Sequence, residues 1–90
     1  MNEIGFLLCK TRRGRVRAGP IMIGDRTSVT IPVRCPAGSR PEALWHTHPS
    51  GTLRLSGQDI KTGEVNGIPH VCVSDGRQGS TVCFRMRRKR

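Results

Sequence analysis

Two histidines and one aspartate stand at a spacing that suits a metal ion. His46 and His48 are two residues apart in a short apolar run that Pro49 stops, and Asp59 follows ten intervening residues later. Because alternate residues of a strand point to the same face, the two imidazoles would share one side of a sheet. A helix that begins beside the end of this strand would bring Asp59 to them. Three protein ligands with a free fourth position are typical of catalytic zinc.

The elements expected around these residues follow from local patterns. A short strand over 43–48 would present the histidines. Ser56 suits a helix N-cap, and Asp59 three residues later is close to a capping box in form. The helix should run to about Val65, where Asn66 and Gly67 end it. The strand end and the helix start are therefore the elements that must position the three ligands.

The rest of the chain is rich in strand signals. Period-two alternation, apolar runs and Gly-containing turns predict strands over 3–10, 15–23 (interrupted at Pro20), 27–35, 69–74 and 81–86. No internal repeat and no linker is present. We therefore predict a single small α+β domain over residues 1–86, with a curved mixed β-sheet and one or two helices, followed by a basic tail at 87–90.

Length and composition limit the number of domains and the cellular compartment. The chain has 90 residues, which is enough for one core, and no apolar run approaches the roughly 20 residues of a membrane span. The amino terminus lacks the features of a secretory signal, so we expect a cytoplasmic protein without membrane contact. Its four cysteines, which form no Cys-x-x-Cys pair, are then expected to be reduced and buried as small apolar residues. A disulfide stays open for a hyperthermophilic source.

The charge is strongly positive. Sixteen Lys and Arg against six Asp and Glu give a net charge of +10, which would attract nucleic acid or any polyanion without a dedicated site. The three aromatic residues lie in expected strands, which weakens the case for base stacking. Charge alone selects no function. Most of the cationic residues fall into two clusters, one at Arg12, Arg13, Arg15 and Arg17 and one at Arg85, Arg87, Arg88, Lys89 and Arg90.

The window that holds the histidines resembles the signature of the JAMM metalloproteases, also called the MPN-plus family: His-x-His-Pro, a short loop, then Ser-x-x-Asp. The matching residues are His46, His48, Pro49, Ser56 and Asp59. The resemblance implies a cytidine-deaminase-like fold and a Zn²⁺ ion held by the two histidines and the aspartate. It also implies a metallopeptidase in which a zinc-activated water attacks an amide carbonyl, while Ser56 helps to hold the developing oxyanion.

The family also uses a glutamate on an upstream strand, in a context like Glu-x-Cys-Gly-Leu-Leu-x-Gly. The segment from Glu3 to Lys10 keeps the acid and both leucines, although Gly5 is one place early and Lys10 stands where Gly is usual. The resemblance implies that Glu3 acts as general base and then as general acid. The upstream rivals are Asp25, expected in a turn, and Glu42. A different interpretation makes Glu3 a solvated residue at a frayed end.

Substrate class comes from the resemblance as well. Family members usually carry a strand and a helix before the glutamate, so the domain would be truncated at its amino terminus. The chain has no room for ubiquitin-gripping insertions and is similar to the compact archaeal and bacterial members. We therefore expect a zinc-dependent isopeptidase or peptidase that cleaves at the carboxyl terminus of ubiquitin-like modifiers or sulfur carriers.

Two alternatives and one assembly remain open. The run His-Thr-His-Pro-Ser-Gly also resembles the RadC-like branch of this fold, which with the basic clusters favours a nucleic-acid-associated protein. A catalytically inactive binding module on the same fold is the other alternative. A homodimer stays open too, because missing amino-terminal elements would leave a sheet edge bare.

Overall fold

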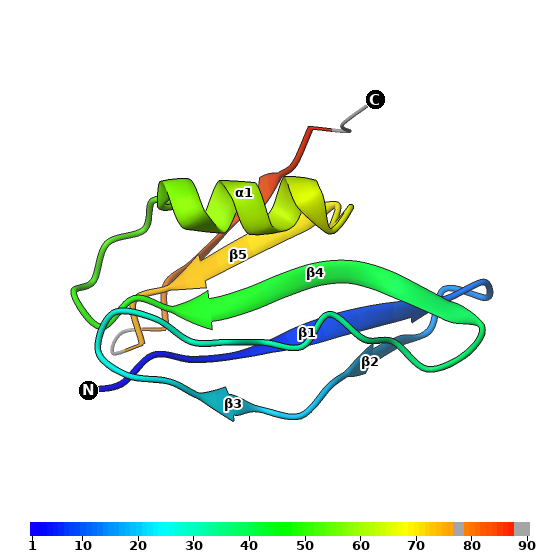
Figure 1. Cartoon of the computed structure of the whole chain (residues 1–90), viewed down its shortest axis with the longest axis horizontal. Helices are drawn as coiled ribbons and strands as arrows, with labels where there is room; N and C mark the ends of the chain where they lie inside the picture. The colour runs from blue at the N-terminus through cyan, green and yellow to red at the C-terminus, as the bar shows by residue number, and fades with distance from the viewer. Residues whose placement is uncertain (77–78, 88–90) are drawn as a thin grey trace.

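A six-stranded mixed sheet forms the body of the structure, a computed structural model that describes residues 1–76 and 79–87 (Figure 1). In these residues the sheet has the order β2-β1-β4-β5-β6, and β3 also pairs with β1. Neighbours are antiparallel except β4 and β5, which are parallel. The α+β prediction is therefore confirmed. The strands are β1 (Ile4–Thr11), β2 (Val16–Ala18), β3 (Met22–Ile23), β4 (Ser39–Thr47), β5 (His70–Ser74) and β6 (Thr81–Arg85).

One helix, α1 (Gly57–Val65), connects the parallel strands β4 and β5 across one face of the sheet. It begins as predicted at Ser56, which forms a complete capping box with Asp59. Gly63 is buried where α1 meets β5, and a Cβ there would lie 2.8 Å from Val71 Cγ2. The glycine therefore lets the helix pack closely on the sheet. No helix in the described residues is long and apolar enough to cross a membrane.

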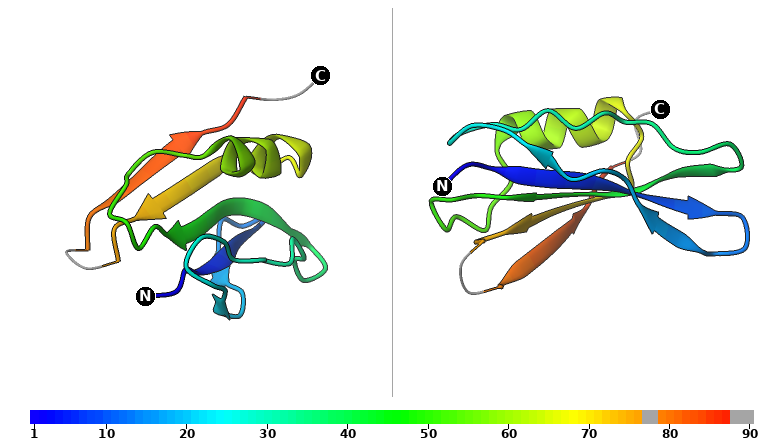
Figure 2. Two further views of the ribbon diagram at one scale, coloured as in Figure 1. Left: turned by 60° about the vertical axis from the view of Figure 1, so that its left-hand side comes forward. Right: turned by 90° about the horizontal axis from the view of Figure 1, so that it is seen from below.

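The core lies between the sheet and the elements that cover this face. Its buried residues come from β1, β4, β5 and the turn before β5, and they are Leu7, Cys9, Leu44, Ile68 and Val71. From the N-terminal half of the chain, Ile31, Val33 and Cys35 pack against them. Figure 2 shows this covering segment on the same side of the sheet as α1. The helix and the segment together close the core on this face of the sheet.

The covering segment corrects one prediction, because residues 27–35 form no strand. The side chains do alternate, with Ile31 and Val33 half-buried and Pro32 and Arg34 exposed. The segment nevertheless lies over the sheet face instead of beside a strand, and it makes no ladder. The alternation of half-buried and exposed side chains therefore shows only that one side of this extended segment faces the core. It does not show that the segment pairs with a strand.

Apart from the start of β4, the remaining outer strand boundaries lie within one residue of those expected. The return strand is broken as Pro20 predicts, into β2 and β3. Strand β4 starts at Ser39, four residues earlier than the predicted strand, and it contains Pro41 where the register with β1 shifts. A register irregularity is one of the places where a sheet tolerates proline. Of the expected tail at 87–90, the structure describes Arg87 alone; residues 88–90 lie outside the described residues.

Both pairs of cysteines form disulfides, so the prediction of four reduced thiols was wrong. Cys9 of β1 is joined to Cys35 at the end of the covering segment. Cys72 and Cys83 are direct partners in the register of β5 and β6 and are joined to each other. Neither pairing can be recognised from a motif in the sequence. Tertiary packing brings Cys9 and Cys35 together, and the register of β5 and β6 brings Cys72 and Cys83 together.

Candidate metal centre

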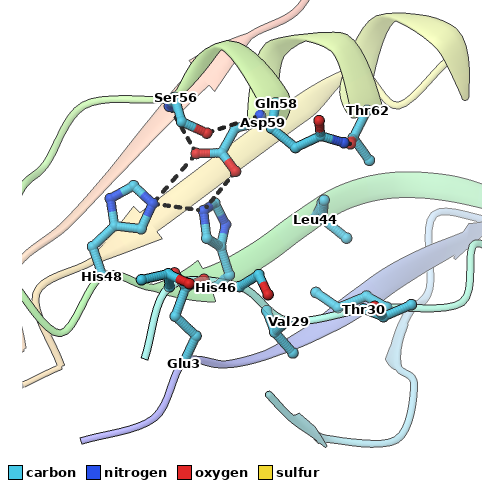
Figure 3. Close-up of a pocket in the computed structure, with 13 residues that line it drawn as sticks. Glu3, Val29, Thr30, Leu44, His46, His48, Ser56, Gln58, Asp59 and Thr62 are labelled. Carbon is cyan, nitrogen blue, oxygen red and sulfur yellow. Dashed lines mark hydrogen bonds and ion pairs between the residues drawn. The ribbon is translucent and has the colours of Figure 1, made fainter. Parts of the chain in front are cut away.

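The three predicted ligands meet at one point (Figure 3). One ligand atom from each of His46, His48 and Asp59 lies within 4.8 Å of the others. His46 Nε2 is 3.2 Å from Asp59 Oδ1, and His48 Nε2 is 3.3 Å from Asp59 Oδ2. The two Nε2 atoms are 3.0 Å apart. Both oxygens of one carboxylate and two imidazole nitrogens therefore face a common centre.

The fold explains this convergence. His46 lies in β4, and His48 follows the end of the strand, where its N–H still donates to the Ser74 carbonyl oxygen at 2.8 Å. The extended backbone therefore continues far enough to place both imidazoles on one face. Asp59 is the third residue of α1, whose start lies at the same end of the sheet. Its Oδ2 accepts a hydrogen bond from the Ser56 N–H at 2.8 Å, which orients the carboxylate.

The loop after β4 fixes the tautomer of His48. Its Nδ1 lies 2.9 Å from the Thr52 carbonyl oxygen, and because a carbonyl only accepts, Nδ1 must carry the proton. In the neutral imidazole, Nε2 then presents a lone pair toward the Asp59 carboxylate, an arrangement that a cation between them would stabilise. A second group that fixes a ligating histidine in this way is common around protein-bound metals. In contrast, the buried Nδ1 of His46 has no hydrogen-bond partner in the described residues.

Electrostatics keep the aspartate charged. Burial of the Asp59 carboxyl raises its pKa, but hydrogen bonds from His46 and from the Ser56 backbone lower it more, and the resulting pKa is about 2. The carboxylate is therefore ionised at neutral pH. Two imidazoles and one ionised carboxylate form a donor set that suits zinc.

Glu3 lies beside these ligands, immediately before β1. It is only 7% exposed, and its side chain points toward the two imidazoles (Figure 3). Its N–H donates to the Asp25 carbonyl oxygen at 2.6 Å, and its carbonyl oxygen accepts from Gly24 N–H at 2.8 Å. The backbone is therefore anchored, in contrast to the frayed end considered above. Burial raises the pKa of the Glu3 carboxyl, while His46 and His48 oppose the rise.

The side chains of the two rival acids make other contacts. Asp25 Oδ1 accepts hydrogen bonds from the backbone N–H groups of Thr27 and Ser28 at 2.9 and 2.8 Å, so it stabilises a turn. Glu42 lies in β4 near Lys10, with 3.9 Å between the charged atoms. Neither residue lines the cavity at the ligands. Of the upstream acids, Glu3 is therefore the one placed to act there.

A cavity of about 400 Å³ opens over the ligands. One wall is formed by α1 through Gln58 and Thr62, and the facing wall is formed by residues 27–31 of the covering segment. Ser56 lines the cavity as well. Sequence reasoning missed both walls. Thr62 could have been found, since it stands three residues after Asp59 and so shares its helix face, but no signal marked residues 27–31.

His70, the third histidine, lies away from this centre. It is the register partner of Ala43 in β4, three residues before His46, so it points to the opposite face of the sheet. No family model, no curated protein and no solved structure matches this chain.

Proposed function

We propose that this protein is a zinc-dependent peptidase or isopeptidase of the JAMM type. One observation carries the proposal: the ligand atoms of His46, His48 and Asp59 lie within 4.8 Å of one another in a cavity that buried Glu3 also lines. The motif resemblance also supports the proposal, because Glu3 and Ser56, to which it gives catalytic roles, both line this cavity. A JAMM-like fold is part of this proposal.

The donor set favours zinc over hard cations. Calcium and magnesium prefer oxygen ligands throughout, whereas two of the three side chains here offer imidazole nitrogen. The lone pair of His48 Nε2 faces an ionised carboxylate, which is favourable only with a cation or a proton between them. When bound, zinc would supply Lewis-acid polarisation of a carbonyl and a water of lowered pKa.

Glu3 would move the proton. Its carboxylate would accept a proton from the attacking water, hold it, and donate it to the amine that leaves. The buried setting suits this role, because desolvation raises the pKa of the carboxyl and makes it a stronger base than an exposed glutamate. The backbone bonds to residues 24 and 25 would keep the side chain in place between the two transfers.

Ser56 would bind the carbonyl oxygen. Its Oγ accepts a hydrogen bond from Asp59 N–H at 3.1 Å, so the hydroxyl proton remains free to donate into the cavity. The helix cap would thus hold the hydroxyl in position before the reaction, which is the condition for useful stabilisation of developing negative charge. Capping and catalysis are compatible uses of the one side chain.

The substrate class rests on the family resemblance. We propose the carboxyl-terminal tails of ubiquitin-like modifiers or sulfur carriers, or amide conjugates of these tails. The cavity between α1 and residues 27–31 would let a peptide segment reach the ligands.

Cleavage of a ubiquitin-like fusion protein tests the proposal. The zinc-loaded wild type should release the carrier at its carboxyl terminus, and His46→Ala and Glu3→Gln should both abolish release. Glu3→Gln should still bind zinc, because Glu3 is outside the ligand set. A wild type that binds zinc and cleaves no member of a panel of ubiquitin-like fusions would favour the inactive binding module instead.

A further inference from the structure

A second hollow lies at the opposite end of the sheet, where β1 turns into β2 and β4 begins. It has a volume of about 910 Å³, and cationic side chains dominate its lining. We call it the basic hollow; its lining residues are Lys10, Thr11, Arg12, Arg13, Gly14, Gly38, Ser39 and Arg40. Figure 1 shows the β1–β2 hairpin and the start of β4 together at this end.

Its positive charges are almost uncompensated. Among the described residues, Lys10 alone of the four cations has an acidic neighbour, Glu42, at the long distance of 3.9 Å. Arg12, Arg13 and Arg40 are exposed. Lys10 and Arg40 are moreover direct register partners on β1 and β4. Like charges opposite each other destabilise a sheet, so an anion between them would stabilise this end.

Three of the six acidic residues lie at the other end of the sheet. Glu3, Asp25 and Asp59 lie at the end of the sheet that holds the metal centre. The register places Arg40 opposite Lys10 and His46 opposite Gly5. Six strand positions separate Arg40 from His46, a distance of roughly 20 Å. The charge is therefore polarised along the sheet, and a polyanion can contact the basic hollow without covering the metal centre.

We propose that the basic hollow binds the sugar-phosphate backbone of a nucleic acid duplex. The planar guanidinium group of arginine can donate two hydrogen bonds to one phosphate group, and three of the four cations in the hollow are arginine. No aromatic ring lines the hollow, and Phe6 and Trp45 stack on each other with 5.0 Å between ring centroids. Stacking platforms typical of single-strand binders are thus missing from the described lining, which favours backbone contact with a duplex. The inference goes beyond the proposed peptidase and does not depend on it.

Fluorescence anisotropy with a short labelled DNA duplex, titrated over a series of salt concentrations, tests this proposal. Each phosphate contact contributes about 0.9 to the slope of log K against log salt. The double variant Arg12→Gln with Arg13→Gln should therefore flatten the slope by about 1.8 and weaken binding about tenfold or more at low salt. The matched control Arg85→Gln with Arg87→Gln removes the same charge at the end of β6 and just after it, outside the hollow, and should leave the slope unchanged.

Three results would overturn the proposal. One is an equal loss in the hairpin and control variants, which would mean that binding follows net charge alone. In the second, a labelled poly-glutamate chain binds as tightly as the duplex does, and its binding depends equally on Arg12 and Arg13. The basic hollow would then be a site for acidic protein segments. A third is tighter binding of single-stranded than of duplex DNA. Circular dichroism and zinc content, expected to be unchanged in both variants, verify that each is folded.

Discussion

Removing the charge of Asp59 should destabilise the metal-free protein by an amount that depends on pH. The Asp59 carboxyl has a pKa of about 2 in the folded state against 3.8 for an ordinary aspartate. That difference corresponds to about 2.4 kcal/mol at most, and because the carboxyl is partly open to solvent, screening reduces it to about 1 kcal/mol. Asp59→Asn keeps the shape of the side chain and an oxygen that can accept from Ser56 N–H, so it isolates the charge.

The sign of the effect defines the experiment. A carboxyl whose pKa is lowered by folding stabilises the protein above pH 3.8 and loses this contribution as the pH falls toward 2. Urea unfolding of wild type and Asp59→Asn, both stripped of metal, should therefore differ by about 1 kcal/mol at pH 6, and the difference should shrink below pH 3.8 and vanish only as the pH falls through about 2. Equal stabilities at pH 6, or a difference at pH 2 as large as the one at pH 6, would refute the assignment of His46 and Ser56 as its hydrogen-bond partners.

Three further perturbations have expected outcomes. Glu3→Gln should stabilise the metal-free protein near neutral pH and give no gain below pH 4.5, because burial raises the pKa of the folded carboxyl; thermal unfolding against pH measures this, and an unchanged stability at pH 7 would contradict it. Removing one disulfide with Cys9→Ser and Cys35→Ser should lower the unfolding free energy by about 3.5 kcal/mol, since the bridge closes 26 residues; urea titration would count against the bridge if the cost were near zero. Gly63→Ala should cost about 1–3 kcal/mol by the same titration, because the new Cβ would lie 2.8 Å from Val71 Cγ2; a neutral substitution would mean that α1 can move away from β5.

The elements whose signals are local were predictable. Ser56 and Asp59 form the expected capping box because a helix N-terminus is decided by residues three apart. Pro20 breaks the return strand because proline lacks the N–H that a ladder needs. The candidate metal ligands were predictable in part for the same reason: His46 and His48 need only the strand period, whereas Asp59 also needs the loop after β4 to bring the helix start beside the strand end.

What depends on tertiary packing was not predictable. Residues 27–35 alternate like a strand because one side faces the core, yet nothing local shows whether a ladder partner lies beside them. The same segment supplies one wall of the cavity, and Cys35 at its end meets Cys9 of β1. A pairing 26 residues apart in sequence has no local signature, so the reduced state was the wrong inference.

Zinc content tests the metal centre most directly. Tag-free wild-type protein, reconstituted with zinc and freed of excess metal, should contain about one zinc per chain by elemental analysis. His48→Ala and Asp59→Asn should lose it, and His70→Ala, which changes the histidine on the opposite face, should keep it. Wild-type protein that takes up no zinc, or variants at the two ligands that retain it as fully as His70→Ala, would contradict the account.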